Sequence, residues 1–154
     1  MRMSSVEEYG LRCLLAVARH TDTESGPLPI QTIASNEGLS PEYVAKLMRI
    51  LREAELVTST RGAAGGYLLA RASHEITILQ AIEALDGALI PDDWCDKHTG
   101  KLDSCVHTEN CTIAGLWRYL SSLLGAAMGQ ITLADLTSGR IAMMNRLHPA
   151  EATP

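Results

Sequence analysis

The chain has 154 residues, of which 46% are hydrophobic, and its formal net charge is −5. This length and composition fit one domain with a real core rather than two full domains. The negative charge excludes a protein that coats nucleic acid non-specifically, because neutralisation of phosphates by Lys and Arg drives that mode of binding. Residues 1–73 are neutral, so the acidic excess lies in the remainder.

The chain starts MRMSSVEEYG, which lacks the apolar core of a signal peptide. No apolar run approaches the roughly 18 residues of a membrane-spanning helix. We therefore expect a soluble, cytoplasmic protein with no membrane partner. In a reducing cytosol, the 4 cysteines fit metal or redox chemistry better than a disulfide framework.

The first predicted helix begins at Ser4 or Ser5, because each has a glutamate three residues further on, as a capping box requires. We expect it to end at about His20. Apolar residues recur at helical spacing along it, which places Cys13 on the buried face. Free cysteine is among the most often buried residue types, so Cys13 is interpreted as an apolar core residue rather than a ligand.

The next segment predicts two helices joined by a tight turn. A short helix from about Ile30 ends at Gly38, a residue suited to a left-handed C-terminal position. A second helix follows at once, with Ser40 as its N-cap and Pro41 at its first position. One face of it is apolar and the other is basic, which is typical of a helix-turn-helix motif. The residues expected to face the major groove of DNA are Ser40, Tyr43, Lys46 and Arg49.

The stretch LVTSTRGAAGGYLLAR predicts a β-hairpin of two short strands joined by a glycine-rich tip. Arg61 lies at that tip. In a winged helix such a tip reaches the backbone or the minor groove of DNA, where arginine suits the negative potential of a narrow groove. A plain surface hairpin is the alternative. The predicted fold is mainly α with a small β-hairpin wing, and residues 1–73 form a winged helix-turn-helix DNA-binding domain.

Residues 74–140 are predicted to contain a helix capped by Thr77, an irregular loop over 88–110 and a long helix that starts at Thr112. The apolar stripe of the long helix is broader than one helix on a small domain normally needs. We therefore expect a C-terminal dimerisation helix that pairs with a second copy of the chain. Residues 141–154 are expected to form a frayed tail.

Three of the cysteines cluster here: Cys95 and Cys105 fall in the irregular loop, and Cys111 directly follows it. Thiolates crowded into one loop can converge on one soft metal centre. Zinc accepts three thiolates and a histidine, but structural zinc sites more often contain close C-x2-4-C pairs, which the loop lacks. His98 and His107 are alternative ligands or solvated side chains. No C-x-x-C, nucleophile elbow, P-loop or GxGxxG accompanies the cysteines, so we expect no enzyme.

The order of these parts resembles the iron-sulfur-cluster branch of the Rrf2 family of winged-helix regulators, over about residues 1–138. The stretches that carry the resemblance are MRMSSVEEYGLRCLL, GLSPEYVAKLMRILREAELVTSTRGAAGGYLLAR, ITILQAIEALDG and CTIAGLW. The resemblance implies a homodimer that binds a palindromic operator on double-stranded DNA. It also implies an iron-sulfur cluster, 2Fe–2S or 4Fe–4S, that controls the affinity for the operator. The implied function is that of a transcriptional regulator, and more specifically a repressor, that senses redox state, nitric oxide or iron.

The resemblance further implies the cluster ligands. The iron-sulfur-assembly repressors use a histidine three residues after the last cysteine, and Ala114 occupies that position here. The nitric-oxide-sensing repressors use an acidic residue near the start of helix 1 of the other subunit, and Glu8 matches it. A redox-sensing relative uses a histidine where this chain has Arg12, which cannot bind iron. The implied metal ligands are Cys95, Cys105, Cys111 and Glu8.

Two alternatives remain at this point. Glu8 has a competing structural role, because it lies three residues after Ser5 and can close a capping box with it. The alternative function is a winged-helix regulator without a cluster, controlled by a protein partner or by zinc or thiol redox chemistry.

Overall fold

The computed structural model of the chain describes residues 4–23, 26–62, 65–88, 94–107 and 111–139. Its elements are, in chain order, α1 (Ser5–Thr23), α2 (Ile30–Glu37), α3 (Pro41–Glu53), β1 (Val57–Thr60), β2 (Gly66–Leu69), the 3-10 turn η1 (Ser73–Glu75), α4 (Ile78–Asp86), α5 (Trp94–Lys97), α6 (Thr112–Gly129) and α7 (Leu133–Thr137). The expected fold class, mainly α with a small hairpin wing and a long C-terminal helix, is confirmed. The tail predicted over 141–154 lies outside the described residues.

A capping box at Ser4 starts α1. The N–H of Glu7 donates to the hydroxyl of Ser4 at 3.2 Å, and the N–H of Ser4 donates to the carboxylate of Glu7 at 2.6 Å. This pairing occupies Glu7, so Glu8 takes no part in the capping box, and its carboxylate is exposed. The helix continues beyond His20 to Thr23, whose hydroxyl donates to a carbonyl one turn earlier at 2.9 Å.

The hydrophobic core lies between α1, α3, α4 and the hairpin. At Gly10, α1 passes so close to α4 that a Cβ atom would collide with the side chain of Leu85. The prediction that Cys13 is a core residue is confirmed, since its side chain is 0% exposed. Other fully buried side chains are Leu14, Val17, Ile33, Leu47, Met48, Leu51, Val57, Ile76 and Leu133.

Burial also makes Cys13 chemically inert. It raises the pKa of this thiol to about 11, so on the order of one thiol in ten thousand is ionised at pH 7. In iron-free, reduced protein we expect a thiol reagent to modify Cys95, Cys105 and Cys111 rapidly and Cys13 only on unfolding. Mass spectrometry of the labelled protein measures this order. Equal labelling rates at all positions would contradict it, and the Cys13→Ala variant should lose only the slow phase.

The predicted helix-turn-helix geometry is confirmed. The chain leaves α2 through Gly38, whose φ of 66° is left-handed, and the Gly38 N–H donates to the carbonyl of Ala34. Ser40 then caps α3, with its hydroxyl oxygen accepting the N–H of Tyr43 at 3.2 Å. The apolar face of α3 is buried against the core, and its basic face stays in solvent.

The wing is an antiparallel pair in which Val57 faces Leu69 and Thr60 faces Gly66. A third segment joins it at Leu28, which exchanges backbone hydrogen bonds of 2.9 Å with Tyr67 in both directions. Gly66 makes this approach possible, because a Cβ atom there would collide with the backbone of Leu28. The segment before α2 therefore fixes the wing to the helix-turn-helix.

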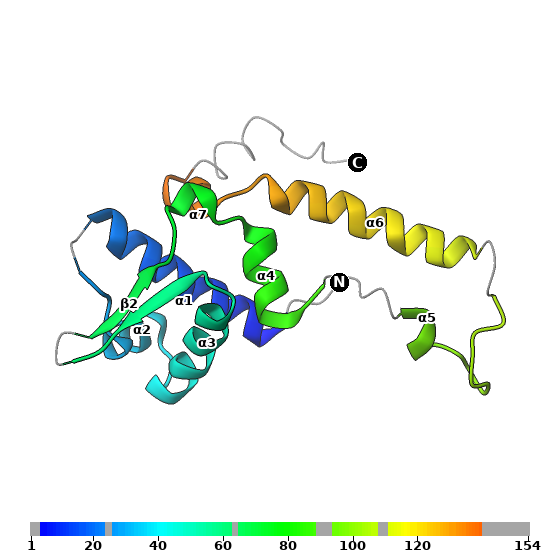
Figure 1. Ribbon diagram of the computed structural model, residues 1–154, viewed down its shortest axis with the longest axis horizontal. Helices are drawn as coiled ribbons and strands as arrows, with labels where there is room; N and C mark the ends of the chain where they lie inside the picture. The colour runs from blue at the N-terminus through cyan, green and yellow to red at the C-terminus, as the bar shows by residue number, and fades with distance from the viewer. Residues whose placement is uncertain (1–3, 24–25, 63–64, 89–93, 108–110, 140–154) are drawn as a thin grey trace, which may run out of the picture.

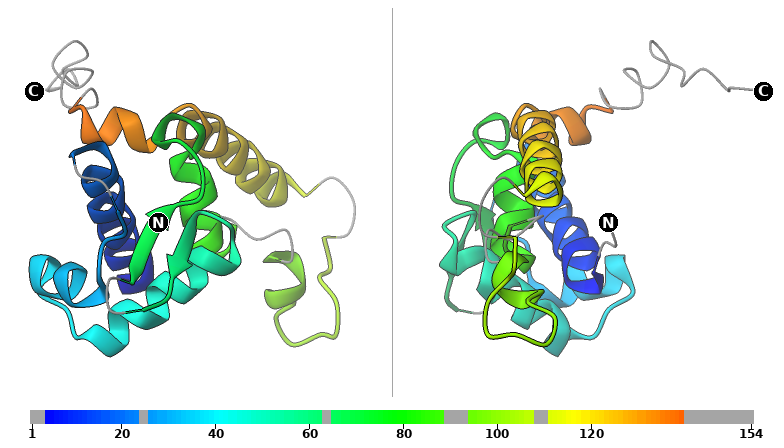
Figure 2. Two further views of the ribbon diagram at one scale, coloured as in Figure 1. Left: turned by 60° about the vertical axis from the view of Figure 1, so that its left-hand side comes forward. Right: turned by 90° about the vertical axis from the view of Figure 1, so that its right-hand side faces the viewer.

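Helix α6 joins the rest of the molecule at its C-terminal end. After it, the carbonyl of Ile131 accepts the N–H of Ile78 at 2.9 Å, and the N–H of Leu133 donates to the carbonyl of Ile76 at 3.0 Å. The other end of α6 extends away from the body, with α5 near that far end (Figures 1 and 2). None of the helices that the structure describes combines the length and hydrophobicity that a membrane crossing needs.

Candidate DNA-binding face and cysteine ligand set

The candidate DNA contacts on α3 are exposed, apart from Tyr43, which is half-buried. Ser40 uses a lone pair of its hydroxyl oxygen as the N-cap, which leaves the hydroxyl hydrogen for an acceptor on DNA. Lys46 lies in solvent on the outer face of the helix. Arg61 is exposed directly after β1, at the end of the strand that lies away from α3.

In the protein without DNA, Arg49 forms an ion pair with a neighbouring glutamate. Its Nε donates to Oε1 of Glu53, one turn further on, at 2.8 Å. This hydrogen bond raises the pKa of Arg49 and lowers the pKa of Glu53. The two side chains are 72% and 58% exposed, so the pair contributes little to stability. Its consequence is electrostatic, because a phosphate or a guanine must displace Glu53 to use the full charge of Arg49.

Tyr43 links α3 to the first turns of α1. Its ring meets the ring of Tyr9 edge to face, with centroids 6.1 Å apart and an interplanar angle of 81°. The guanidinium carbon of Arg12 lies 5.5 Å from the centroid of Tyr9 on α1, within the range of a cation–π contact. Tyr43 is therefore a packing residue of the α1–α3 interface as well as a candidate DNA contact.

Arg12 also ties α1 to the end of α2. Its Nε donates to Oε2 of Glu37 at 2.7 Å, and its Nη2 donates to the carbonyl of Glu37 at 3.0 Å. The hydrogen bond to Glu37 is the main cause that raises the pKa of Arg12, and the charge of Glu8 adds a smaller contribution. We did not predict this contact, because nothing local in a sequence indicates which glutamate an arginine 25 residues away will meet.

The three candidate cysteine ligands are half-buried and come from different local structures. Cys95 lies on the four-residue helix α5, so the segment predicted to be irregular contains a helical turn. Cys105 lies among the turns and bends that follow α5, and Cys111 is the N-cap of α6. The N–H of Ala114 donates to Sγ of Cys111 at 3.5 Å, so the residue at the position of the family histidine interacts with this sulfur through its backbone.

Glu8 lies on α1 in the body of the molecule, whereas α5 lies towards the far end of α6 (Figure 2). Among the described residues of the chain, no three His, Cys, Asp or Glu side chains are gathered closely enough to hold a metal ion. His98 and His107 are exposed within the cysteine segment. A ligand set drawn from these residues therefore requires a rearrangement of the segment, a second protomer, or both.

Comparison with known proteins identifies the family. The family model described as Rrf2, iron-dependent transcriptional regulator, matches residues 3–139. The HTH-type transcriptional regulator IscR of Sodalis glossinidius is 36% identical over 138 residues, which cover 90% of this chain and 79% of that protein. IscR of Erwinia tasmaniensis is 35% identical over 140 residues, which cover 91% of this chain and 81% of that protein.

Solved structures agree with this relationship. CymR, the global cysteine regulator of B. subtilis, superposes with a TM-score of 0.71 at 29% identity, over 90% of this chain and 97% of that chain. IscR of T. potens gives a TM-score of 0.67 at 28% identity, over 100% of this chain and 93% of that chain. The expectation that the chain is not an enzyme is confirmed, because these relatives are regulators of transcription. With its winged helix-turn-helix, the chain belongs to the Rrf2 family and is a DNA-binding transcriptional regulator.

Proposed function

We propose that the chain is a homodimeric repressor that binds a palindromic operator through α3 and the wing, under the control of an iron-sulfur cluster. The observation that carries the DNA-binding face is the solvent exposure of Lys46, Arg49 and Arg61 on the recognition helix and the wing. Each protomer supplies one such face. A dimer presents two of them to half-sites about 34 Å apart, one turn of the double helix.

The exposed face of α6 supports the proposal that the chain forms a homodimer. Four large apolar side chains lie exposed along one side of it, with exposed fractions of 57% for Ile113, 46% for Leu116, 63% for Tyr119 and 49% for Leu123. Monomeric proteins seldom leave such a contiguous apolar patch in water. The residue spacing places the four on one face of a 3.6-residue helix, which suits pairing with the same face of a second chain.

The donor set of the chain fits an iron-sulfur cluster in kind. Cys95, Cys105 and Cys111 supply three thiols, the ligand type that such clusters prefer. Glu8, left out of the capping box, offers a free carboxylate at the start of α1. A bound cluster supplies a centre that responds to oxidation, to nitric oxide or to iron supply. A carboxylate is a harder and weaker ligand for iron than thiolate, so Glu8 provides the exchangeable position.

The contacts of α1 connect this position to the DNA-binding face. Tyr9 follows Glu8 directly and packs on Tyr43 of α3, while Arg12 holds Glu37 immediately before the turn of the helix-turn-helix. A displacement of the first turns of α1 therefore reaches α3 by two routes. Engagement or release of Glu8 by the partner protomer's cysteine segment then alters the spacing of the two recognition helices, and with it the affinity for the operator.

Substitutions of Arg49 and Arg61 test the DNA-binding face. With DNA selected by the wild-type protein from a random-sequence pool, Arg49→Ala should reduce affinity by about tenfold or more. If the guanidinium contacts a base, the substitution should relax the sequence preference at one base pair. If it contacts a phosphate, the substitution should lower the affinity for all DNA sequences equally. Glu53→Ala, the matched partner variant, should increase affinity by removing the competing carboxylate. Unchanged affinity and salt dependence in the Arg49→Ala and Arg61→Ala variants would contradict the assignment.

A regulator that works without a cluster is the second candidate. It is favoured by the separation of Glu8 from the cysteine segment within one protomer. Anaerobic purification followed by iron and sulfide quantification separates the two. Protein that stays colourless and iron-free after reconstitution supports the second candidate, and a brown protein with visible charge-transfer absorption supports the first.

A further inference from the structure

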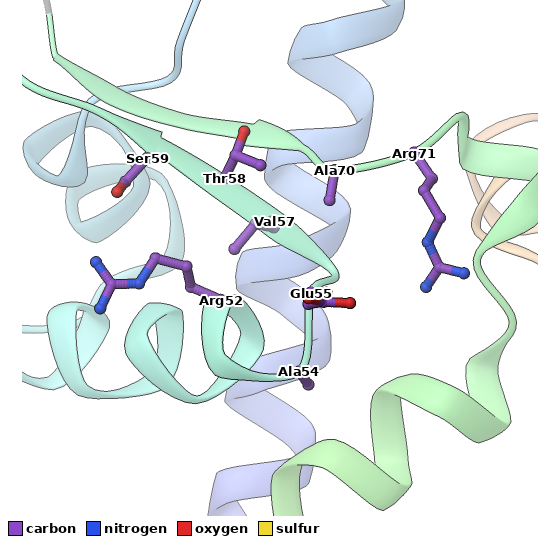
Figure 3. A pocket seen from close by; sticks show the side chains of 8 residues that line it. All are labelled: Arg52, Ala54, Glu55, Val57, Thr58, Ser59, Ala70 and Arg71. Atoms are coloured by element: carbon purple, nitrogen blue, oxygen red, sulfur yellow. The ribbon is translucent and has the colours of Figure 1, made fainter.

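A hollow of about 560 Å³ lies at the base of the wing, where the last turn of α3 faces the hairpin (Figure 3). Arg52 of α3 and Arg71, which follows β2, stand on opposite sides of it. The hydroxyl-bearing residues Thr58 and Ser59 of β1 line it, together with Glu55 from the connection between α3 and β1. The hollow thus has a cation at each end, and the guanidinium group of Arg52 points away from Arg71 (Figure 3).

The two arginines differ from the paired arginines of the domain. Arg12 and Arg49 each donate a hydrogen bond to a glutamate. Arg52 and Arg71 are exposed, and neither guanidinium group forms a hydrogen bond or an ion pair within the described part of the chain. A guanidinium without a carboxylate partner keeps its donors free, and their planar arrangement matches the oxygens of a phosphate group. Thr58 and Ser59 are neighbours on β1 and face opposite sides of the hairpin, so one of the two hydroxyl groups can add an uncharged donor on the side of a bound phosphate.

The position of the hollow indicates which phosphate it receives. It opens on the side of the hairpin away from α1, which passes behind in Figure 3. Arg52 lies one turn after Arg49 on α3, and β1 leads from the hollow to Arg61. Strand β1 has 4 residues and is therefore roughly 13 Å long. This length corresponds to about four nucleotides along one strand of DNA. The hollow is therefore continuous with the candidate DNA-binding face.

We propose that Arg52 and Arg71, at the two ends of the hollow, each contact a backbone phosphate of double-stranded DNA that lies outside the bases read by α3. A free anion is the poorer occupant, because exposed guanidinium groups attract it only weakly in water. DNA already held by α3 and the wing tip presents its next phosphate at high effective concentration. The inference rests on the proposed function, since it requires that α3 and the wing engage DNA.

Glu55 provides a second charge test at the hollow, opposite in sign to the test on the two arginines. Its φ of 56° is left-handed, unusual for a residue with a side chain, and its carboxylate lies on the lining of the hollow. A phosphate in the hollow meets repulsion from this carboxylate. Removing the negative charge at Glu55 should therefore strengthen binding, while removing either positive charge should weaken it.

The experiment measures affinity for DNA selected by the wild-type protein, over a series of salt concentrations. Arg52→Ala and Arg71→Ala should each weaken binding by about tenfold and lower the salt slope by about 1, with unchanged base preference. Glu55→Gln should bind more tightly. Arg118→Ala is the matched control, since Arg118 is exposed on α6 and its loss changes the net charge equally. Thermal melting checks that all variants fold.

Each other outcome has a defined meaning. Arg52→Ala and Arg71→Ala variants that match Arg118→Ala in affinity and slope would overturn the inference while leaving the proposed function intact. A wild-type protein that selects no DNA sequence would instead remove the proposed function. Inorganic phosphate should compete no better than chloride at equal ionic strength. Stronger competition that disappears in the Arg52 and Arg71 variants would assign the hollow to a free anion and overturn the DNA assignment.

Discussion

Replacing Leu116 with glutamate is expected to convert the protein to a monomer and to lower its affinity for a palindromic operator by about 10²- to 10⁴-fold. Leu116 lies within the exposed apolar stripe of α6. Burying a carboxylate between two such stripes costs more than the apolar contacts return, because the charge loses its water without gaining a partner. A monomer then binds each half-site independently and loses the effective concentration that the linked second face provides.

Ser122→Glu is the matched control for this prediction. Ser122 is exposed on α6 but lies outside the stripe, roughly 100° around the helix from Leu123. It introduces the same charge into the same helix, and the protein should remain dimeric. Sedimentation or light scattering gives the mass, and the operator titration gives the affinity. A Leu116→Glu variant that sediments as the wild type does would show that α6 is not the dimer contact.

Removing a thiol from the cysteine segment is the second substitution with a large expected effect. Cys105→Ala or Cys111→Ala should yield protein that retains little or no iron after anaerobic reconstitution, because each removes one of the three proposed thiolate ligands. Glu8→Ala should still assemble a cluster, with a shorter lifetime in air or under a chelator, since the carboxylate is the weaker ligand. Visible absorption, together with iron and sulfide content, measures both effects.

Glu7→Ala separates a ligand effect from a folding effect at the start of α1. Glu7 closes the capping box with Ser4, so its loss should cost about 1 kcal/mol of stability and leave the lifetime of the cluster unchanged. Glu8→Ala should show the opposite pattern. If the Glu8→Ala variant keeps the spectrum and the cluster lifetime of the wild type, Glu8 is not a ligand. The proposed coupling from the cluster through Tyr9 to α3 would then be wrong.

Features with a local signal were predictable from the sequence. The left-handed turn at Gly38, the N-cap at Ser40 and the buried face of α3 follow from residue type and spacing within one or two turns, and the structure contains all of them. The hairpin follows from two β-prone runs around a glycine-rich tip. In each case the interacting groups are neighbours in the chain, so the sequence specifies the partner together with the contact.

Features that depend on tertiary packing were not predictable. The choice of Ser4 over Ser5 as the cap was open, because both have a glutamate at the required spacing. The contacts of Arg12 with Glu37 and of Tyr9 with Tyr43 arise only when α1 crosses the helix-turn-helix. The hollow was not predictable for the same reason, because Arg52 and Arg71 come to line it only after the hairpin folds back beside α3.

Among the described residues, α6 is attached to the body through its C-terminal end, and this attachment has a mechanical consequence. Its 18 residues span roughly 27 Å, so a tilt of about ten degrees at the base moves the far end by about 5 Å. Conversely, a force applied at the far end produces a larger force near the base of α6. There the backbones of Ile131 and Leu133 are hydrogen-bonded to those of Ile78 and Ile76. Ile76 and Ile78 lie a few residues beyond Arg71 and the returning strand of the wing. Helix α6 therefore acts as a lever, and a movement of its far end is transmitted to the segment that follows the wing.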